Sequence, residues 1–137
     1  MSVVIDSSIT LAWFFSNERT AAADAVLGQV TESSAVAPSL WRLEVANGLQ
    51  MAVRRKRITA AFRDASLADL NGLVVAIDPE TDRHAWTITL RLAERHQLTV
   101  YDAAYLELAQ RLGLPLATLD QELRVAGGAL GVTLLGR

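Results

Sequence analysis

Acidic residues stand at the ends of short apolar segments in this 137-residue chain, where they could serve as metal ligands or as helix caps. Asp6 follows Val-Val-Ile, Asp78 follows Val-Ala-Ile and Asp120 follows Ala-Thr-Leu. Asp102 enters a predicted helix from the preceding loop. Taken singly, each of them is more often a cap or a turn residue. Pro79 favours the turn interpretation for Asp78, which we therefore leave out of the candidate site.

Glu44 differs from these aspartates because it falls inside a predicted helix. It lies beside Leu43 and one turn from Leu40, on what the spacing predicts to be the inward face of that helix. A lone carboxylate is costly to bury there unless it is paired or bound to a metal. The alternative is that Glu44 reaches solvent at the edge of this face or pairs with an arginine.

The four acids Asp6, Glu44, Asp102 and Asp120, here called the acidic quartet, have a chemical meaning as a set. If they converge on one edge of a sheet, their mutual repulsion requires a cation. An all-oxygen ligand set selects hard ions such as Mg²⁺ or Mn²⁺. Such a site would carry out hydrolysis by positioning and deprotonating water and by stabilising charge on a phosphoryl oxygen.

The elements that would place these acids follow from the apolar pattern. Continuous apolar runs without polar alternation predict strands that are buried on both faces of a parallel sheet. Helical spacing fills the segments between them, so we expect an α/β fold with a central parallel sheet of about five strands flanked by helices. Sites in such sheets form outside the carboxyl ends of the strands. The predicted strands span residues 3–5, 35–37, 73–77, 116–119 and 132–135, and the predicted helices span residues 9–15, 18–30, 38–54, 59–70, 81–96 and 101–112, with a short helical stretch after residue 120.

Length and composition narrow the possible function classes. A chain of 137 residues with 51% hydrophobic and 20% charged residues predicts one folded domain over residues 1–137. The chain has no cysteine, which excludes disulfides, zinc-thiolate sites and cysteine nucleophiles. The sequence shows no signal peptide and no apolar run of ~20 residues, so we expect a cytoplasmic protein without a membrane partner. Because the net charge is −2, any nucleic acid must bind locally.

Four motifs occur in a fixed order along the chain: Val-Val-Ile-Asp6-Ser-Ser, Leu-Glu44-Val-Ala-Asn, Leu-Thr-Val-Tyr-Asp102-Ala-Ala-Tyr and Ala-Thr-Leu-Asp120. With these motifs the chain resembles, nearly end to end, the PIN-domain ribonucleases of the VapC toxin type. The resemblance implies a PIN fold and metal-dependent endonucleolytic cleavage of RNA. It also implies a homodimer, within a larger toxin–antitoxin assembly, that is inhibited by a cognate VapB-type antitoxin.

The same resemblance assigns roles to individual residues. The acidic quartet matches the catalytic residues and metal ligands of the family, with Mg²⁺ or Mn²⁺ as the cofactor. Thr118 matches a small hydroxyl residue two positions before the last aspartate, and Glu122 falls where many members carry a further acid. Ser8 is expected to support the site by hydrogen bonding.

A basic run, Arg54-Arg55-Lys56-Arg57, ends one of the predicted helices. These four residues could contact RNA phosphates, or they could simply complement the negative end of the helix dipole. The sequence favours neither interpretation over the other.

An aromatic run, Trp13-Phe14-Phe15, closely follows the first acidic motif. Such a run indicates core or interface packing more often than base stacking. We expect part of the surface of residues 9–15 to be covered by another chain, either a dimer mate or an antitoxin segment lying in a groove beside the acidic pocket. An arginine from that partner could neutralise the carboxylates.

Two other functions stay open at this point. A receiver-like domain with an acidic pocket needs a lysine near its phosphoryl group, and the chain's one lysine, Lys56, lies in the basic run. A noncatalytic PIN-like binding module would keep the fold without the chemistry. The complete acidic quartet argues against this second alternative.

Overall fold

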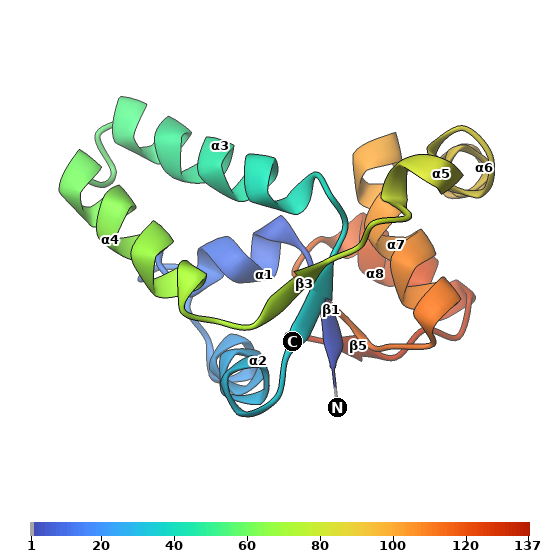
Figure 1. Cartoon of the computed structure of the whole chain (residues 1–137), viewed down its shortest axis with the longest axis horizontal. Coiled ribbons are helices and arrows are strands. Elements are labelled where there is room, and N and C mark those ends of the chain that lie inside the picture. The colour runs from blue at the N-terminus through green and yellow to red at the C-terminus, as the bar shows by residue number, and fades with distance from the viewer. Residues whose placement is uncertain (1) are drawn as a thin grey trace.

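Five short parallel strands form the centre of the molecule (Figure 1). The computed structural model describes residues 2–137. The strands are β1 (Val3–Ile5), β2 (Ala35–Ala37), β3 (Val75–Ile77), β4 (Leu116–Ala117) and β5 (Leu134–Leu135), and they lie in the order β3-β2-β1-β4-β5. Every neighbouring pair is parallel. The predicted α/β fold with about five parallel strands is therefore confirmed.

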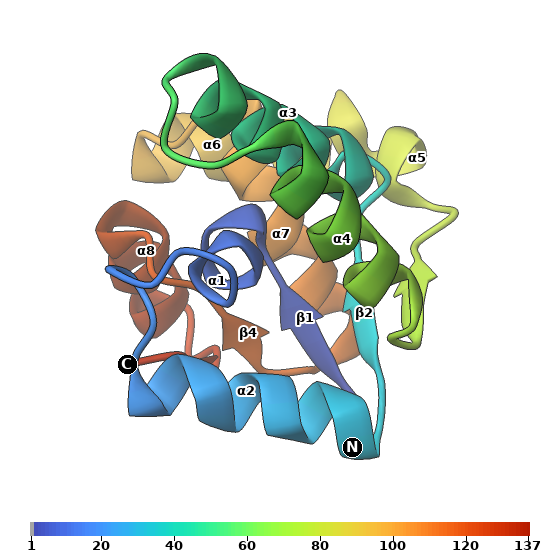
Figure 2. The ribbon, with the colours of Figure 1, turned by 90° about the vertical axis from the view of Figure 1, so that its left-hand side faces the viewer.

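Helices lie on both sides of this sheet (Figures 1 and 2). One side carries α1 (Ser7–Ala12), α2 (Ala21–Glu32), α3 (Trp41–Arg54) and α4 (Ala60–Asn71). The other side carries α5 (Thr81–Ala85), α6 (Ile88–His96), α7 (Val100–Leu112) and α8 (Gln121–Ala129). Helices α3 and α4 form a hairpin whose turn projects away from the sheet at the upper left of Figure 1. No helix within residues 2–137 is long and apolar enough to cross a membrane.

Side-chain caps fix where several of these helices begin. Asp6, Thr20, Thr59, Thr99 and Asp120 each accept a hydrogen bond from the backbone N–H three residues later. Such caps satisfy amide groups that have no partner inside the helix. Asp6 directly follows β1, and Asp120 lies three residues after the end of β4, so the cap interpretation holds for both candidate site residues.

The central strand β1 and the edge strands differ in burial. Val3, Val4 and Ile5 are completely buried, as the apolar run predicts. In β3, by contrast, Ala76 and Ile77 are exposed, and both residues of β5 are only half-buried. The prediction that all strands are fully buried is wrong for these two, because each lies at an edge of the sheet, where a strand has a neighbour on one side only.

The predicted helix over residues 81–96 is also wrong as a single element. It divides into α5 and α6 at Trp86 and Thr87, where Thr87 has φ −120° and ψ −98°. The apolar period continues through this point, so the sequence pattern does not reveal the break. The β-branched run Thr87-Ile88-Thr89 weakens the local preference for helix, and this favours the interruption.

Candidate active site

Asp6 is the most enclosed member of the acidic quartet, with 4% of its surface exposed. Its Oδ1 atom accepts hydrogen bonds from the backbone N–H of Ile9 at 3.0 Å and from Ser8 Oγ at 2.7 Å. Its Oδ2 atom accepts a hydrogen bond from the hydroxyl of Thr118. The carboxylate is therefore held in one orientation by donors from two separate parts of the chain.

The loop after β4 is held against the start of α1 by the same hydroxyl groups. Ser8 Oγ accepts a hydrogen bond from the N–H of Leu119 at 2.9 Å, and Thr118 Oγ1 accepts one from the N–H of Asp120 at 3.0 Å. These contacts are possible because β1 and β4 are neighbours, although more than 100 residues separate them in the sequence. The expected supporting roles of Ser8 and Thr118 correspond to these hydrogen bonds.

Glu44 is half-buried in the first turn of α3, and its Oε1 atom accepts a hydrogen bond from the hydroxyl of Tyr105 at 2.5 Å. The predicted inward face of this helix is wrong in one respect, since Leu43 is 76% exposed. The buried face of α3 consists of Trp41, Val45, Leu49 and Ala52. Glu44 therefore lies beside that face and reaches the site through its contact with α7.

Tyr105 belongs to the candidate site by its contact with Glu44, although no sequence motif assigned it a role there. Tyr105 is 1% exposed and lies three residues after Asp102 on α7. Residues three apart share one face of a helix, so this spacing is the signal that could have found it. The partner of its hydroxyl, Glu44, is 61 residues away in the sequence and could not be read from the spacing.

Asp102 lies in the first turn of α7, where it is half-buried. Thr99 caps the helix by accepting a hydrogen bond from the N–H of Asp102 at 3.1 Å. Helix α7 begins at Val100, two residues before Asp102, so the predicted entry at Asp102 itself is late. The position places the carboxylate at the N-terminal end of the helix, where the helix dipole favours negative charge.

The pKa values show that the quartet shares one electrostatic field. Burial raises the pKa of Asp6 to about 6, against the lowering effect of its hydrogen bonds from Thr118, Ile9 and Ser8. Burial also raises the pKa of Asp102, and the charges of Asp120 and Glu44 raise it further. Asp102 in turn raises the pKa of Asp6. Asp102 therefore interacts with the charge of each of the other three carboxylates, which places the quartet around the start of α7.

Glu122 makes a smaller contribution to this field. It is exposed in the first turn of α8, and its charge also raises the pKa of Asp102. Ion pairs in residues 2–137 involve none of the quartet, so its negative charge has no protein cation beside it. Carboxylate oxygens such as those of the quartet and Glu122 are ligands that suit a hard divalent cation. Within residues 2–137, no three carboxylate or imidazole side chains are arranged in this conformation so that they could hold a metal ion.

Two other sequence predictions fall outside this cluster. The basic run begins at Arg54, the last residue of α3, and continues into the turn before α4, at the end of α3 opposite to Glu44. Lys56 is therefore not the phosphoryl-binding lysine of a receiver-like site. Trp13 and Phe15 are buried within the chain, with 4% and 7% of their surfaces exposed, and the Trp13 ring N–H donates to the Ala23 carbonyl. Phe14 is the least buried residue of the aromatic run.

The PIN domain family matches residues 3–129 of the chain. The chain belongs to the PIN domain family. A curated relative of this PIN domain is ribonuclease VapC3 of Pyrobaculum aerophilum, which is 32% identical over 123 residues, covering 90% of this chain and 92% of the relative. This identity over nearly the whole length places the chain with the VapC proteins of the family.

Solved structures share the fold of this PIN domain. The structure of PAE2754 from Pyrobaculum aerophilum has a TM-score of 0.71 at 27% identity and covers 98% of this chain and 83% of that one. The structure of VapBC2 from Rickettsia felis, bound to a DNA fragment from their promoter, has a TM-score of 0.65 at 11% identity, with 98% and 97% covered. The second likeness concerns the fold alone.

Proposed function

We propose that this PIN domain is a metal-dependent endoribonuclease, and that it acts in the cytoplasm as the toxin of a VapBC-type toxin–antitoxin pair. One observation carries the proposal: the charge of Asp102 interacts with those of Asp6, Glu44 and Asp120, and no ion pair within residues 2–137 neutralises any of the four. Such repulsion is tolerable when a divalent cation is bound. The VapC relatives, named as ribonucleases, supply the reaction class.

The chain's own residues divide the work of such a site between them. Asp6, Glu44, Asp102 and Asp120 would hold Mg²⁺ or Mn²⁺, which lowers the pKa of bound water and stabilises charge on a phosphoryl oxygen when present. Asp6 is oriented for this role by Ser8 and Thr118, and Glu44 is oriented by Tyr105. The two carboxylates are thus pre-positioned by hydrogen bonds before any substrate arrives.

Asp102→Asn tests this assignment because the amide keeps the size of the side chain and removes its charge. RNA cleavage by the purified variant should fall by roughly 100-fold or more in Mg²⁺, since a ligand is lost. Without metal the variant should be at least as stable as the parent, because one repulsive charge is gone. Mg²⁺ should raise the melting temperature of the parent more than that of the variant.

Asp82→Asn is the matched control for this experiment. Asp82 is exposed and, like Asp102, lies in the first turn of a helix. Its amide variant should cleave RNA at the parent rate and respond equally to Mg²⁺. Full Mg²⁺-dependent cleavage by Asp102→Asn would show that the acidic quartet is not the active site.

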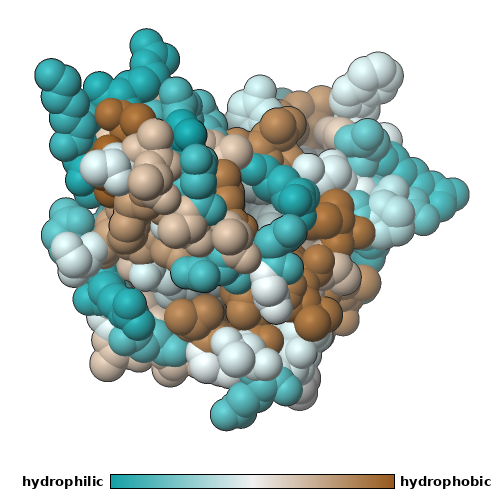
Figure 3. All heavy atoms as spheres, turned by 60° about the vertical axis from the view of Figure 1, so that its left-hand side comes forward, coloured by the Kyte–Doolittle hydropathy of each residue, from teal (hydrophilic) through white to brown (hydrophobic). Residues whose placement is uncertain are grey.

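The basic turn, defined as Arg54, Arg55, Lys56 and Arg57, supports RNA binding as a second part of the proposal. All four residues are exposed, and long hydrophilic side chains project from the upper left of Figure 3, the side on which the α3–α4 turn lies in Figures 1 and 2. Arg54 lies ten positions after Glu44 on α3, which is about 15 Å along the helix axis. RNA bound at the acids could therefore place a neighbouring phosphate on this turn.

Arg54→Gln combined with Arg55→Gln tests the RNA contact. If both residues hold phosphates, binding should weaken for all RNA sequences, and the slope of log affinity against log salt should fall by about 1 per lost contact. An unchanged slope would leave only the helix-dipole role. Arg83→Gln is the matched control, because Arg83 is an exposed arginine on α5 that pairs with Glu80.

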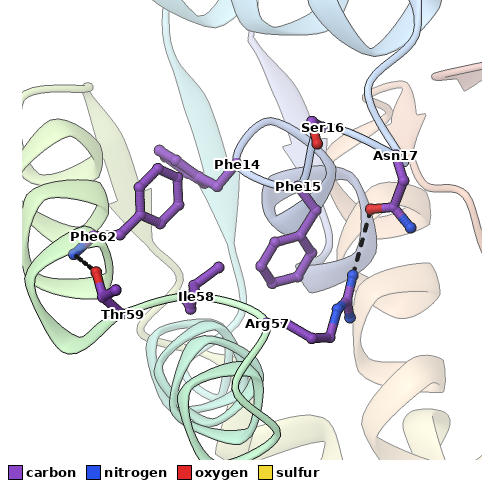
Figure 4. Close-up of a pocket in the computed structure, with 8 residues that line it drawn as sticks. All are labelled: Phe14, Phe15, Ser16, Asn17, Arg57, Ile58, Thr59 and Phe62. Atoms are coloured by element: carbon purple, nitrogen blue, oxygen red, sulfur yellow. Dashed lines mark hydrogen bonds between the residues drawn. The ribbon is translucent and has the colours of Figure 1, made fainter.

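An apolar groove next to the end of α1 supports a protein partner (Figure 4). Phe14, Phe15, Ile58 and Phe62 point into a cavity of about 590 Å³, and the guanidinium of Arg57 lies 4.8 Å from the centre of the Phe15 ring. Phe62 is 43% exposed. We propose that an apolar segment of the VapB-type antitoxin fills this groove, because Phe14 and Phe15 of the aromatic run line it.

Phe62→Asp should weaken the toxin–antitoxin complex by at least tenfold, because a charge would enter the apolar contact. Isothermal titration with the VapB-type antitoxin measures this, and Phe62 is exposed enough that the free chain should stay folded. Unchanged affinity would place the partner elsewhere. Light scattering on the same samples measures whether the proposed homodimer forms.

A further inference from the structure

Arg124 makes two hydrogen bonds that its place in a helix does not explain. The residue is half-buried in α8, one turn after the cap residue Asp120. Its Nη1 atom donates to the carbonyl of Thr118 at 2.8 Å and to the carbonyl of Leu135 at 2.9 Å. A cation near the N-terminal end of a helix is disfavoured by the helix dipole. Arg124 therefore stabilises something other than α8 itself.

The two carbonyls belong to the ends of neighbouring strands. Thr118 follows β4 and Leu135 ends β5, and the N–H of Thr118 also donates to the Leu135 carbonyl at 3.2 Å. Arg124 therefore closes a small ring of hydrogen bonds that joins β5 to the loop after β4. Strand β5 has two residues and lies at the edge of the sheet, so few other contacts hold this loop against it.

Thr118 connects this ring to the acidic site. Its N–H and carbonyl are bound by Leu135 and Arg124, while its hydroxyl donates to Asp6 and accepts from the N–H of Asp120. All the polar groups of this completely buried residue are thus engaged. Fixing its backbone from the β5 side fixes the position of its Cβ, from which the hydroxyl reaches Asp6.

We propose that Arg124 is a positioning residue for the acidic site, which acts by holding the 118–120 loop against β5. The ribonuclease part of this inference rests on the function proposed above. The role of Arg124 is indirect, since its guanidinium contacts backbone carbonyls and none of the four carboxylates. Strand β5 contributes no residue to the acidic quartet. Through Arg124 it nevertheless helps to orient Asp6 and Asp120.

Arg124→Met tests the inference because it keeps the apolar stem of the side chain and removes its donors. NMR hydrogen exchange reports on the loop directly, since the N–H groups of Leu119 and Asp120 donate to Ser8 and Thr118. We expect exchange at these two amides to become roughly tenfold faster, as loss of one net hydrogen bond implies, while the amides of β1 keep their protection. Arg124→Lys keeps a shorter donor and should recover part of the protection.

Cleavage kinetics supply the second measurement. Arg124→Met should lower kcat by about tenfold with KM for RNA changed less than twofold, because an acid is misplaced and no RNA contact is lost. Arg137→Met is the matched control, since Arg137 bonds only the exposed side chain of Gln121. It should change neither the exchange rates nor kcat.

The outcomes separate the two proposals. Unchanged exchange at the amides of Leu119 and Asp120 in Arg124→Met would overturn the positioning role. Exchange that becomes equally faster at these amides and at those of β1 would also overturn it, because it would indicate general destabilisation. If Arg124→Met does not fold, the same two readouts apply to Arg124→Lys. If the parent chain cleaves no RNA, the function proposed above fails, and the exchange experiment still decides whether Arg124 holds the loop.

Discussion

Replacing Arg111 with methionine removes the cation that two buried carboxylates share. Arg111 Nη2 lies 2.6 Å from Asp78 Oδ2, and its Nε lies 2.8 Å from Glu107 Oε2. The side chains of Asp78 and Glu107 are 6% and 4% exposed, whereas that of Arg111 is 24% exposed. Because α7 carries Arg111 together with Asp102 and Tyr105, this ion triad anchors a helix of the candidate site to the end of β3.

The expected loss of stability follows from this burial. Removing one partner of a buried ion pair costs about 3–5 kcal/mol, and the partial exposure of Arg111 points to the lower end, about 3 kcal/mol at pH 7. For 137 residues the entropy of unfolding near 60 °C is roughly 0.29 kcal/mol/K, so the melting temperature should fall by about 10 °C. Cleavage should persist at temperatures where the variant remains folded.

The loss should depend on pH in a defined direction. Burial alone would raise the pKa of Asp78, but the Arg111 guanidinium, aided by hydrogen bonds from Glu80 and Thr81, holds it below its ordinary value of 3.8. A lowered pKa contributes stability that is complete above the ordinary value and is lost as pH falls through the folded-state value. In Arg111→Met, burial without the cation would raise the pKa of Asp78 instead. The difference in stability between parent and variant should therefore shrink from pH 7 to pH 4.

Urea unfolding followed by circular dichroism at pH 7 and pH 4 measures both effects. Arg83→Met is the control, because Arg83 pairs with Glu80 at 3.3 Å on the surface and its loss should cost less than about 0.5 kcal/mol. A loss below 1 kcal/mol for Arg111→Met at pH 7, or a loss that grows on acidification, would refute the reasoning.

Three further predictions concern single residues. Tyr105→Phe removes the donor to Glu44 and should lower kcat by about tenfold and stability by about 1–3 kcal/mol, which single-turnover cleavage and urea unfolding measure. Gly136→Ala should lower the melting temperature, because at φ 107° a Cβ would lie 3.0 Å from Ile9 Cδ1 and 3.3 Å from the Thr118 carbonyl oxygen. Lys56→Gly should raise the free energy of unfolding by up to about 1 kcal/mol, because Lys56 has φ 61°, a backbone conformation that glycine adopts without strain. Chemical denaturation measures this change in stability.

Much of the fold was predictable because its signals are local. The buried run of β1, the cap at Thr59 and the end of α7 at Gly113, which has φ 65°, depend on residues within one turn of each other. Position at a strand end likewise marks Asp6 and Asp120 as candidates. The order of the strands is not local, and the exposure of β3 and β5 follows from that order.

The sequence by itself determined which residues could form the acidic quartet, since their types and their places at strand and helix ends are local properties. Only the tertiary structure decided what holds them. The hydroxyl of Thr118 reaches Asp6 across 112 residues, and that of Tyr105 reaches Glu44 across 61. Pairs this distant meet because β1 lies between β2 and β4, an arrangement set by the packing of the whole chain and by no pattern within one segment.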